Sequence, residues 1–239
     1  MKHLLPLLLL TAYLLFLPSP AARSQELTLY GEGIIPTGSY GSSGIAKLDG
    51  YYRPVSAIFD KGCSIGSASY GWGAGFQIAF PMATRAMDLV ADAGFRMNWL
   101  DNTMRTYFND YAAYNHSEGI TKAPLYLNIP LMLGPRVNIN LFDNFGLYAA
   151  LTAGINIRVI TNAIFTPDYY YNYRGTCTLA LRASAGMLIS QHLRIEAGWS
   201  WLGDKEVKAI ILDDDNFSKR TVLGRLRTTQ FSIRLGWSF

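Results

Sequence analysis

The sequence predicts an all-β fold, an eight-stranded antiparallel up-and-down transmembrane β-barrel, and three observations predict it. Apolar residues alternate with polar or small residues along eight segments, which is the period of a strand with one apolar and one polar face. Charged residues make up 16% of the chain and aromatic residues 13%, which is a poor surface for a soluble domain. The connections between the segments alternate between long and short, as the loops and turns of membrane barrels do.

The first 24 residues are expected to form an export signal. A basic start is followed by an apolar run from Leu4 to Leu17, and small residues precede Gln25. A run of this length is typical of a signal peptide and short for a membrane-spanning helix. We therefore predict a signal peptide at 1–24 and a single barrel domain at 25–239. The net charge of +4 falls when the signal is removed, and no basic run indicates nucleic-acid binding.

The first four expected strands differ in how clearly they alternate. The pattern is weak in LTLYGEGIIP and clear in the three segments that follow. Aromatic and apolar residues from Tyr70 to Phe80 alternate with glycines and Gln77, and Met87 to Trp99 alternates with charged or small residues. YLNIPLML places Leu or Ile at every second position. These strands are expected at 27–36, 70–80, 87–99 and 125–133.

The last four expected strands are the most regular, and the final one ends the chain. In TQFSIRLGWSF the apolar residues occupy every second position up to Phe239. Across the seven clearer segments the apolar side carries no charged residue. The dry interior of a β-sandwich would give the same clean side, so the polar side has to distinguish the two folds. These strands are expected at 147–159, 179–189, 193–201 and 231–239.

The polar side of the strands favours the barrel. It is rich in Arg, Gly, Ser, Thr and Asn and short of Lys and Glu. Arg beside Asp and Glu suits a narrow polar interior, because each guanidinium can make several charge-assisted hydrogen bonds. An eight-stranded barrel is just wide enough for side chains to fill it. The predicted lumen charge network is Glu32, Asp88, Asp92, Arg96, Arg158, Arg182, Arg194, Glu196 and Arg234.

The connections predict which end of the barrel faces outward. Outer-membrane barrels have short periplasmic turns and longer external loops. The short connections are 81–86, 134–145 and 190–192, and the long external loops are 37–68, 100–122, 160–176 and 203–225. A ten-stranded barrel that uses 45–59 as a further hairpin is the alternative.

Aromatic residues near the strand ends agree with this orientation. Tryptophan is enriched where a membrane meets water. Four tryptophans fall near the external ends of their strands, and an aromatic pair falls at the periplasmic end. The predicted aromatic girdle consists of Trp72, Trp99, Trp199 and Trp201 at the external rim, and of Trp237 and Phe239 at the periplasmic rim.

The final strand resembles the insertion signal of bacterial outer-membrane proteins. Phe239, Trp237 and Leu235 match its alternating hydrophobic positions, while Arg234 replaces a Gly often found there and Gly236 lies nearby. YLNIPLMLG followed by FGLYAALTAGI looks like the generic group of small outer-membrane barrels that includes PorT-like, OmpA-like and OmpX-like proteins. The resemblance implies a bacterial outer-membrane location and insertion by the barrel-assembly machinery. It also implies contact with outer-membrane lipid and lipopolysaccharide, and membership of an envelope protein complex for some relatives.

The chain offers little chemistry for catalysis. His116 and His192 lie outside the expected strands, and the NHSEG segment is more typical of a solvated loop than of a catalytic triad. The acidic run Asp213–Asp215 lacks the spacing of a calcium loop. We therefore expect no enzyme activity, no metal site and no cofactor.

The external loops carry the residues that suggest recognition. Tyrosine offers a large contact area with a hydrogen-bonding tip, although a girdle or loop packing would also explain the pattern. Cys63 and Cys177 both fall near the outer rim, and the oxidising compartment allows a disulfide between them. The recognition candidates are Tyr107, Tyr111, Tyr114, Tyr169, Tyr170, Tyr171 and Tyr173.

Three functions remain open from the sequence. The first is a barrel with a side-chain-filled lumen that acts as a structural or interaction subunit of an envelope assembly, through its external loops or its lipid face. The second is a narrow channel or lateral transporter for small or apolar molecules, which Pro130 inside a strand and the glycines Gly71, Gly73 and Gly75 would suit. The third is a lipid-modifying enzyme that would depend on His116.

Overall fold

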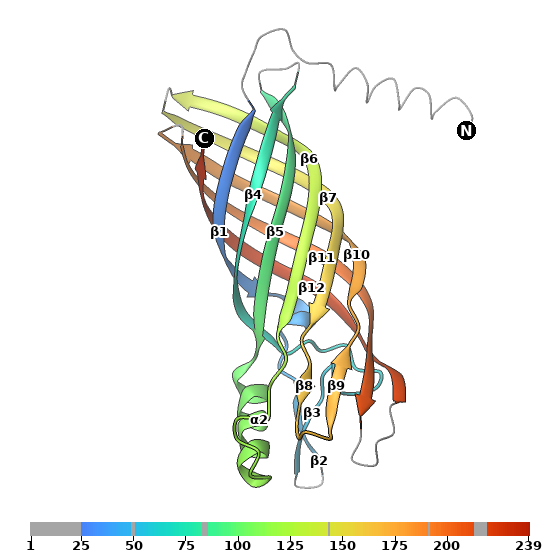
Figure 1. Cartoon of the computed structure of the whole chain (residues 1–239). Helices are drawn as coiled ribbons and strands as arrows, with labels where there is room; N and C mark the ends of the chain where they lie inside the picture. Colours follow the sequence, from blue (N-terminus) through green and yellow to red (C-terminus); the bar gives the residue numbers. More distant parts are fainter. Residues whose placement is uncertain (1–24, 49–50, 83–85, 143, 191, 213–218) are drawn as a thin grey trace, which may run out of the picture.

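Eight long strands close into one antiparallel ring in the computed structural model (Figure 1). The structure describes residues 25–48, 51–82, 86–142, 144–190, 192–212 and 219–239, so the expected signal peptide lies outside the described residues. Each strand pairs with the next, and β12 closes the ring on β1. The eight-stranded prediction is confirmed. The ring consists of β1 (Glu26–Pro36), β4 (Ala68–Pro81), β5 (Met87–Leu100), β6 (Tyr126–Phe142), β7 (Phe145–Ile160), β10 (Thr176–Ile189), β11 (Leu193–Leu212) and β12 (Lys219–Ser238).

The ten-stranded alternative is wrong. Residues 45–59 contribute β2 (Ile45–Leu48) and β3 (Tyr51–Pro54), which form a separate two-stranded sheet. Strands of four residues are too short to cross a bilayer, which takes about 9–11 residues. Two further short strands, β8 (Ala163–Ile164) and β9 (Tyr170–Tyr173), attach to the end of β11.

Alternation along the strands divides the side chains between two environments. Leu29, Leu151, Leu179 and Leu235 are between 50% and 69% exposed on the outside, while polar residues between them are buried inside. Closing the ring pairs the backbone groups of every strand, which lipid could not satisfy. The apolar exterior is therefore suited to acyl chains.

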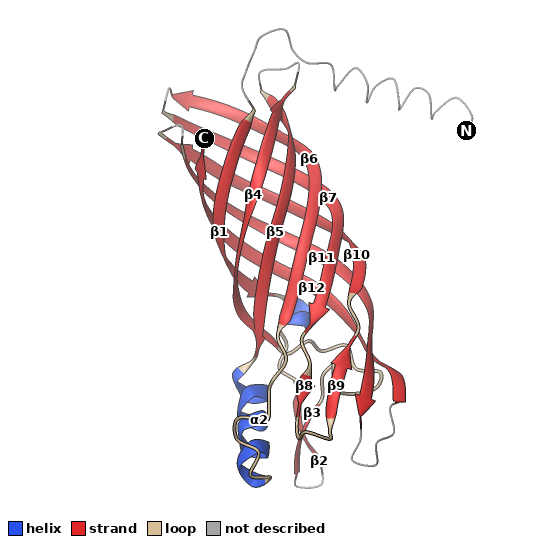
Figure 2. Ribbon diagram, viewed as in Figure 1, coloured by secondary structure: helices blue, strands red, loops and turns tan. Residues whose placement is uncertain are grey.

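The two ends of the barrel differ in the way the sequence predicts. Figure 1 shows the start of β1 and the end of β12 at the end that the sequence predicts to be periplasmic, and the short strands and the helix at the end that it predicts to be external; these names are kept for the two ends. Strands dominate Figure 2, where α2 (Asn102–Tyr114) and the single-turn η1 (Gly38–Tyr40) are the helical elements among the described residues. No helix in the described part of the chain is both long and apolar enough to span a membrane.

Two expected connections are wrong because they belong to strands. The expected connection 134–145 is mostly strand, because Pro135 lies opposite Leu89 and β6 continues to Phe142. The expected loop 203–225 is mostly the extension of β11 and β12 into a hairpin.

The sequence did not predict this hairpin, because bulges interrupt the alternation of apolar and polar residues along it. The β11–β12 register shifts between Trp201 and Asp204 and again between Glu206 and Lys208. Each bulge moves the following side chains to the opposite face, so the period of two is lost. Gly203 has a φ of +96°, which glycine adopts readily at such a bulge.

The expected loop 100–122 contains the helix α2. The Asp101 carboxylate caps it by accepting a hydrogen bond from the Met104 N–H at 2.8 Å. Met104, Phe108 and Ala112 are buried at a spacing of four, so one side of the helix packs inward.

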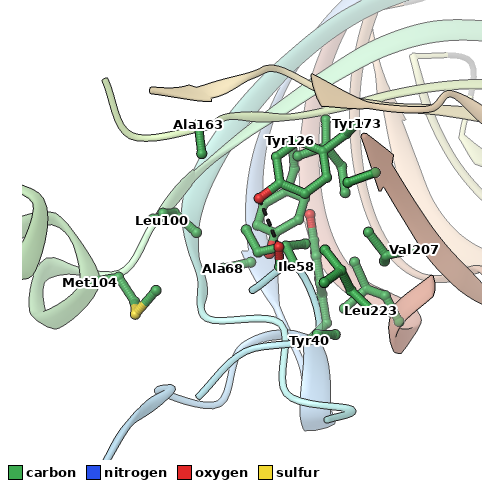
Figure 3. Close-up of a cluster of buried hydrophobic side chains, with 14 of the residues drawn as sticks. Tyr40, Ile58, Ala68, Leu100, Met104, Tyr126, Ala163, Tyr173, Val207 and Leu223 are labelled. Atoms are coloured by element: carbon green, nitrogen blue, oxygen red, sulfur yellow. Dashed lines mark hydrogen bonds between the residues drawn. The ribbon is translucent and has the colours of Figure 1, made fainter. Parts of the chain in front are cut away.

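The external end of the barrel has its own hydrophobic core, which we call the cap core. It joins residues from α2, the loop after β3, the external ends of the barrel strands, and β8 and β9. Figure 3 shows Tyr40, Tyr126 and Tyr173 converging there with Ile58 and Leu223. Its buried members are Tyr40, Ala57, Ile58, Ala68, Leu100, Met104, Phe108, Tyr126, Ile160, Ala163, Phe165, Tyr173, Val207, Ala209, Leu223 and Leu226.

Candidate functional site: a filled lumen beneath an external cap

The centre of the lumen is organised around Glu32. Its carboxylate accepts a hydrogen bond from Arg96 Nε at 2.6 Å and another from Arg234 Nε at 2.9 Å. The side chains of Glu32 and Arg96 are 0% exposed. Two guanidinium groups therefore hold one buried carboxylate from strands on both sides of β1.

Arg234 connects Glu32 to two more carboxylates. It forms an ion pair with Asp92 and lies 3.5 Å from Glu196 Oε1. Its guanidinium lies 3.9 Å from the centre of the Tyr30 ring, and the Tyr30 hydroxyl donates to Asp92 Oδ1 at 2.9 Å. Because the donors of Arg234 reach three acids, this residue is the hub of the network.

Arg182 completes the middle of the lumen, and a glycine makes room for it. Its Nη2 donates to Glu196 Oε1 at 2.7 Å, and its Nη1 donates to Ser232 Oγ at 2.9 Å. A Cβ at Gly198 would lie 2.6 Å from Arg182 Nη2. Gly73 faces the Glu32 carboxylate in the same way, so these small positions accommodate large neighbours.

The periplasmic end of the lumen also holds Glu26 and Arg136. The predicted charge network left them out, because Glu26 precedes the expected strand 27–36 and Arg136 lies in the expected connection 134–145. Arg136 donates to Asp88 Oδ2 at 2.7 Å and to Glu26 Oε2 at 3.1 Å. Arg194 also forms an ion pair with Glu26. The parity of Arg136 with Tyr126 and Asn128 could have revealed it if β6 had been extended past Pro135.

Arg158 lies at the external end of the lumen and differs from the other arginines. It makes no ion pair with any described residue; its donors reach the Leu226 carbonyl at 3.0 Å, Thr228 Oγ1 at 3.2 Å and the Lys205 carbonyl at 3.3 Å. Its guanidinium therefore links the lumen to the backbone just beneath the cap core.

All nine residues of the predicted lumen network are buried within the barrel, each at most 6% exposed. Eight take part in ion pairs, and Arg158 takes part in neutral hydrogen bonds. A cavity of about 10 Å³ remains beside Tyr148 and Arg194, which is room for about one water molecule. The described lumen is filled by its own side chains.

The cap core closes the external mouth above this network. The Tyr40 and Tyr126 rings meet edge to face at 5.2 Å, and the Tyr126 hydroxyl donates to the Gly66 carbonyl. Burial raises the pKa of Tyr173 well above its usual range. Tyr173 is therefore protonated and donates to the Ile58 carbonyl at 2.7 Å, tying β9 to the loop after β3.

The seven recognition candidates divide into inward-facing and outward-facing groups. Tyr107, Tyr111, Tyr169 and Tyr171 pack against the cap core, and Tyr173 belongs to it; burial also raises the pKa of Tyr107. Tyr114 is 86% exposed at the end of α2, and Tyr170 is half-buried on the other face of β9. The sequence pattern did not separate these roles, because burial in the cap depends on its tertiary packing.

The predicted girdle residues lie on the outer wall. Trp72, Trp99 and Trp199 are 47%, 37% and 44% exposed, and Trp201 is half-buried. At the opposite end, the Trp237 ring stacks on His192 at 5.3 Å. Trp237 and Phe239 are 51% and 69% exposed.

The disulfide that the sequence allows is not formed in this structure: both cysteines are free. Cys177 is exposed on the outer wall, opposite Ile157 on β7. The Cys63 carbonyl accepts a hydrogen bond from the Arg225 N–H, so Cys63 lies against the cap side of β12.

The residues of the NHSEG segment do not form a catalytic arrangement in the described structure. His116 and Glu118 are exposed, and the Ser117 hydroxyl lies 2.7 Å from Thr121 Oγ1. Within the described ranges no cluster of three or more His, Cys, Asp or Glu could hold a metal ion. The acidic run Asp213–Asp215 lies outside the described residues.

A closed ring with an apolar exterior and a buried ionic interior defines a small transmembrane β-barrel protein of the bacterial outer membrane. No protein-family model and no curated protein matches the chain. The narrower grouping with PorT-like proteins therefore stays a prediction.

Solved structures of similar outline are outer-membrane proteins. OprG from Pseudomonas aeruginosa is 14% identical with a TM-score of 0.48, over 91% of this chain and 97% of that chain. Ail of Yersinia pestis, solved with the heparin analogue sucrose octasulfate, is 13% identical with a TM-score of 0.42, over 91% and 100%. AlkL, solved in lipid bilayers, is 11% identical with a TM-score of 0.45, over 93% and 94%. Alignments this loose transfer no ligand or partner to this chain.

Proposed function

We propose that this protein is a non-conducting outer-membrane barrel that serves as a structural or interaction subunit of an envelope assembly, with its external cap as the contact surface. One observation carries the proposal: the lumen is closed twice, by the ion-pair network around Glu32 and Arg234 and by the cap core above it. A barrel closed in this way leaves no continuous path for ions or solutes through its lumen. An ordered cap gives a partner a rigid surface, which reduces the entropy lost on binding.

The surroundings that we propose follow from the barrel's location. Outer-membrane lipid and lipopolysaccharide contact the apolar wall and the rim, and the barrel-assembly machinery inserts the chain through its terminal strand. The partner is a protein of the envelope. Nucleic acid has no place in this proposal.

Single-channel recording tests the closed lumen. Purified protein in a planar bilayer should give no stable conductance steps at either polarity, because each ion would have to displace buried ion pairs. Stable, reproducible open levels would refute the proposal.

Site-specific photo-crosslinking tests the contact surface. A photoreactive residue at Tyr114, which is 86% exposed on the cap, should capture one envelope protein in living cells. The matched control at Leu151, which is 61% exposed on the lipid-facing wall, should capture none. Capture from Leu151 alone would move the contact to the lipid face, and capture from neither position would refute the interaction role.

A second candidate function, lateral passage of small apolar molecules, is favoured by the wall at Pro130. The β5–β6 pairing stops after Ala93–Leu131 and resumes at Arg96–Asn128, because proline has no N–H to donate. Beside this interruption, a hollow of about 400 Å³ lies on the apolar wall over β5, β6 and β7.

Pro130→Val distinguishes this second function. The variant restores an N–H and should slow uptake of an apolar tracer into proteoliposomes if the interruption is a gate. Pro135→Val, on the same strand, is the matched control. Equal uptake by both variants and by the unchanged protein would exclude the gate.

A further inference from the structure

A hollow of about 460 Å³, lined by both polar and apolar side chains, lies on the external cap, away from the lumen. This volume falls within the range of about 300–1,000 Å³ that is usual for small-molecule sites. The residues that line it include Lys122, Asn162, Pro167, Tyr170 and Asn172. None of them belongs to the ion-pair network.

The hollow is the outer face of a small sheet whose inner face is the cap core. Lys122 bridges Ile164 on β8, and Ile164 pairs with Tyr170 on β9. Successive side chains of a strand point to opposite faces. Since Tyr171 and Tyr173 face the cap core, Tyr170 and Asn172 face the hollow.

The backing of the hollow is ordered by hydrogen bonds and ring stacking. Lys122 and Ile164 exchange backbone hydrogen bonds of 2.8 and 3.0 Å. Beneath them, the Phe165 ring stacks on Phe108 at 4.9 Å and on Tyr169 at 5.0 Å. A ligand would therefore meet a preformed surface, which favours binding.

Four side chains around the hollow are free to bind. Within the described part of the chain, Lys122, Asn162, Tyr170 and Asn172 make no side-chain hydrogen bond or ion pair. Each amide offers two donors and one acceptor, the ammonium three donors, and the phenol an apolar ring with a polar tip. Lys122 is the one charged residue among the described residues that line the hollow.

We propose that this hollow binds an acidic saccharide, a sugar unit that carries a carboxylate, phosphate or sulfate group. The two amides suit neighbouring hydroxyls, the Tyr170 ring suits the C–H face of a sugar ring, and Lys122 suits the anionic substituent. The inference deepens the proposed function and rests on it, because the cap is the contact surface in both. The sugar belongs either to lipopolysaccharide of the same membrane or to a soluble polysaccharide.

Calorimetry on the full barrel in nanodiscs tests the site. The probes are a uronic-acid oligosaccharide, a neutral glucose oligosaccharide of equal length, and lipopolysaccharide with and without its core sugars. The acidic oligosaccharide should bind more tightly than the neutral one, and lipopolysaccharide should require its core sugars. Tighter binding of one acidic probe over the other identifies the source, and either order supports the site.

Paired variants localise the binding. Lys122→Gln and Asn172→Asp should each weaken binding of the acidic probe by about tenfold. The first removes a charge-assisted hydrogen bond, and the second adds a negative charge that repels the anionic group. Lys61→Gln, which alters an exposed residue elsewhere on the cap, should leave it unchanged.

Equal binding by the Lys122 and Asn172 variants and the unchanged protein would overturn the proposal, as would no binding of any acidic probe. If the acidic probes do not bind and the planar bilayer shows no conductance steps, only the saccharide site is overturned. Stable conductance with intact binding overturns the closed-barrel function alone.

Discussion

Replacing Glu32 by glutamine should destabilise the barrel strongly, because it removes the central negative charge of the lumen. Arg234 would keep Asp92 and Glu196 as partners. Among described residues, Arg96 would keep only uncharged acceptors: the amide oxygen of the new side chain and Gln230 Oε1, which lies 3.4 Å from its Nη1. A fully buried guanidinium would therefore be left without a carboxylate.

The magnitude follows from the burial of the pair. Removing one partner of a buried ion pair costs about 3–5 kcal/mol, since the other charge stays buried and unpaired. With a denaturant slope of about 2 kcal/mol per molar urea, the unfolding midpoint should fall by about 2 M. Adding Arg96→Met to Glu32→Gln removes the orphaned charge, and the double variant should be more stable than Glu32→Gln alone.

The assay is urea unfolding in lipid vesicles, followed by the gel mobility difference between folded and unfolded chains. Asp204→Asn is the control, because the Arg225–Asp204 distance of 2.7 Å nearly matches the 2.6 Å of Arg96–Glu32. Arg225 is 68% exposed, and solvent screens such a pair, so this midpoint should not move. If Glu32→Gln and Asp204→Asn gave equal midpoints, the ion pairs of the lumen would not stabilise the fold.

Three further predictions use the same vesicle system. Gly198→Val should push Arg182 away from Glu196 and lower the unfolding free energy by about 1–3 kcal/mol. Gly33→Val, where a Cβ has nothing within 4 Å, should change the unfolding free energy little, and equal effects of the two variants would contradict the packing argument. Leu151→Arg, near the middle of β7 on the apolar wall, should cost about 2–4 kcal/mol, whereas Val222→Arg on the external hairpin should be nearly neutral; urea midpoints will show the difference. Without reductant, the unfolded chain should label at both cysteines, and a count of zero would indicate a disulfide.

The barrel wall could be predicted from the sequence because its two environments differ so sharply. Lipid outside and packed ions inside leave a period of two in nearly every strand. The predicted end of β11 was wrong where that period breaks, at the bulges near Gly203. In β6 the period continues through Pro135, with Gly134 and Arg136 buried and Pro135 and Val137 exposed. Arg136 was missed because the expected strand stopped at Leu133, although the alternation continues past that residue.

The cap could not be predicted in the same way. Its core gathers residues from five or more segments, and no single segment shows which of its aromatic residues face inward. The helix α2 did leave local signals, namely Asp101 as a cap and buried positions at Met104, Phe108 and Ala112. The sequence could not decide whether Cys63 and Cys177 pair, because it placed both at one rim without their distance from each other.

The ionic lumen also explains how one sequence specifies one register. A slip of one residue between strands would exchange the two faces of the strand. In β12 it would carry Arg234 to the lipid and bring Leu235 into the ion network. An arginine on the lipid face costs about 2–4 kcal/mol near the midplane, and the carboxylates that it leaves inside lose their partner. An apolar lumen would carry no such penalty, because either face could then meet lipid. The buried charges therefore specify register even where an apolar filling could match them in stability.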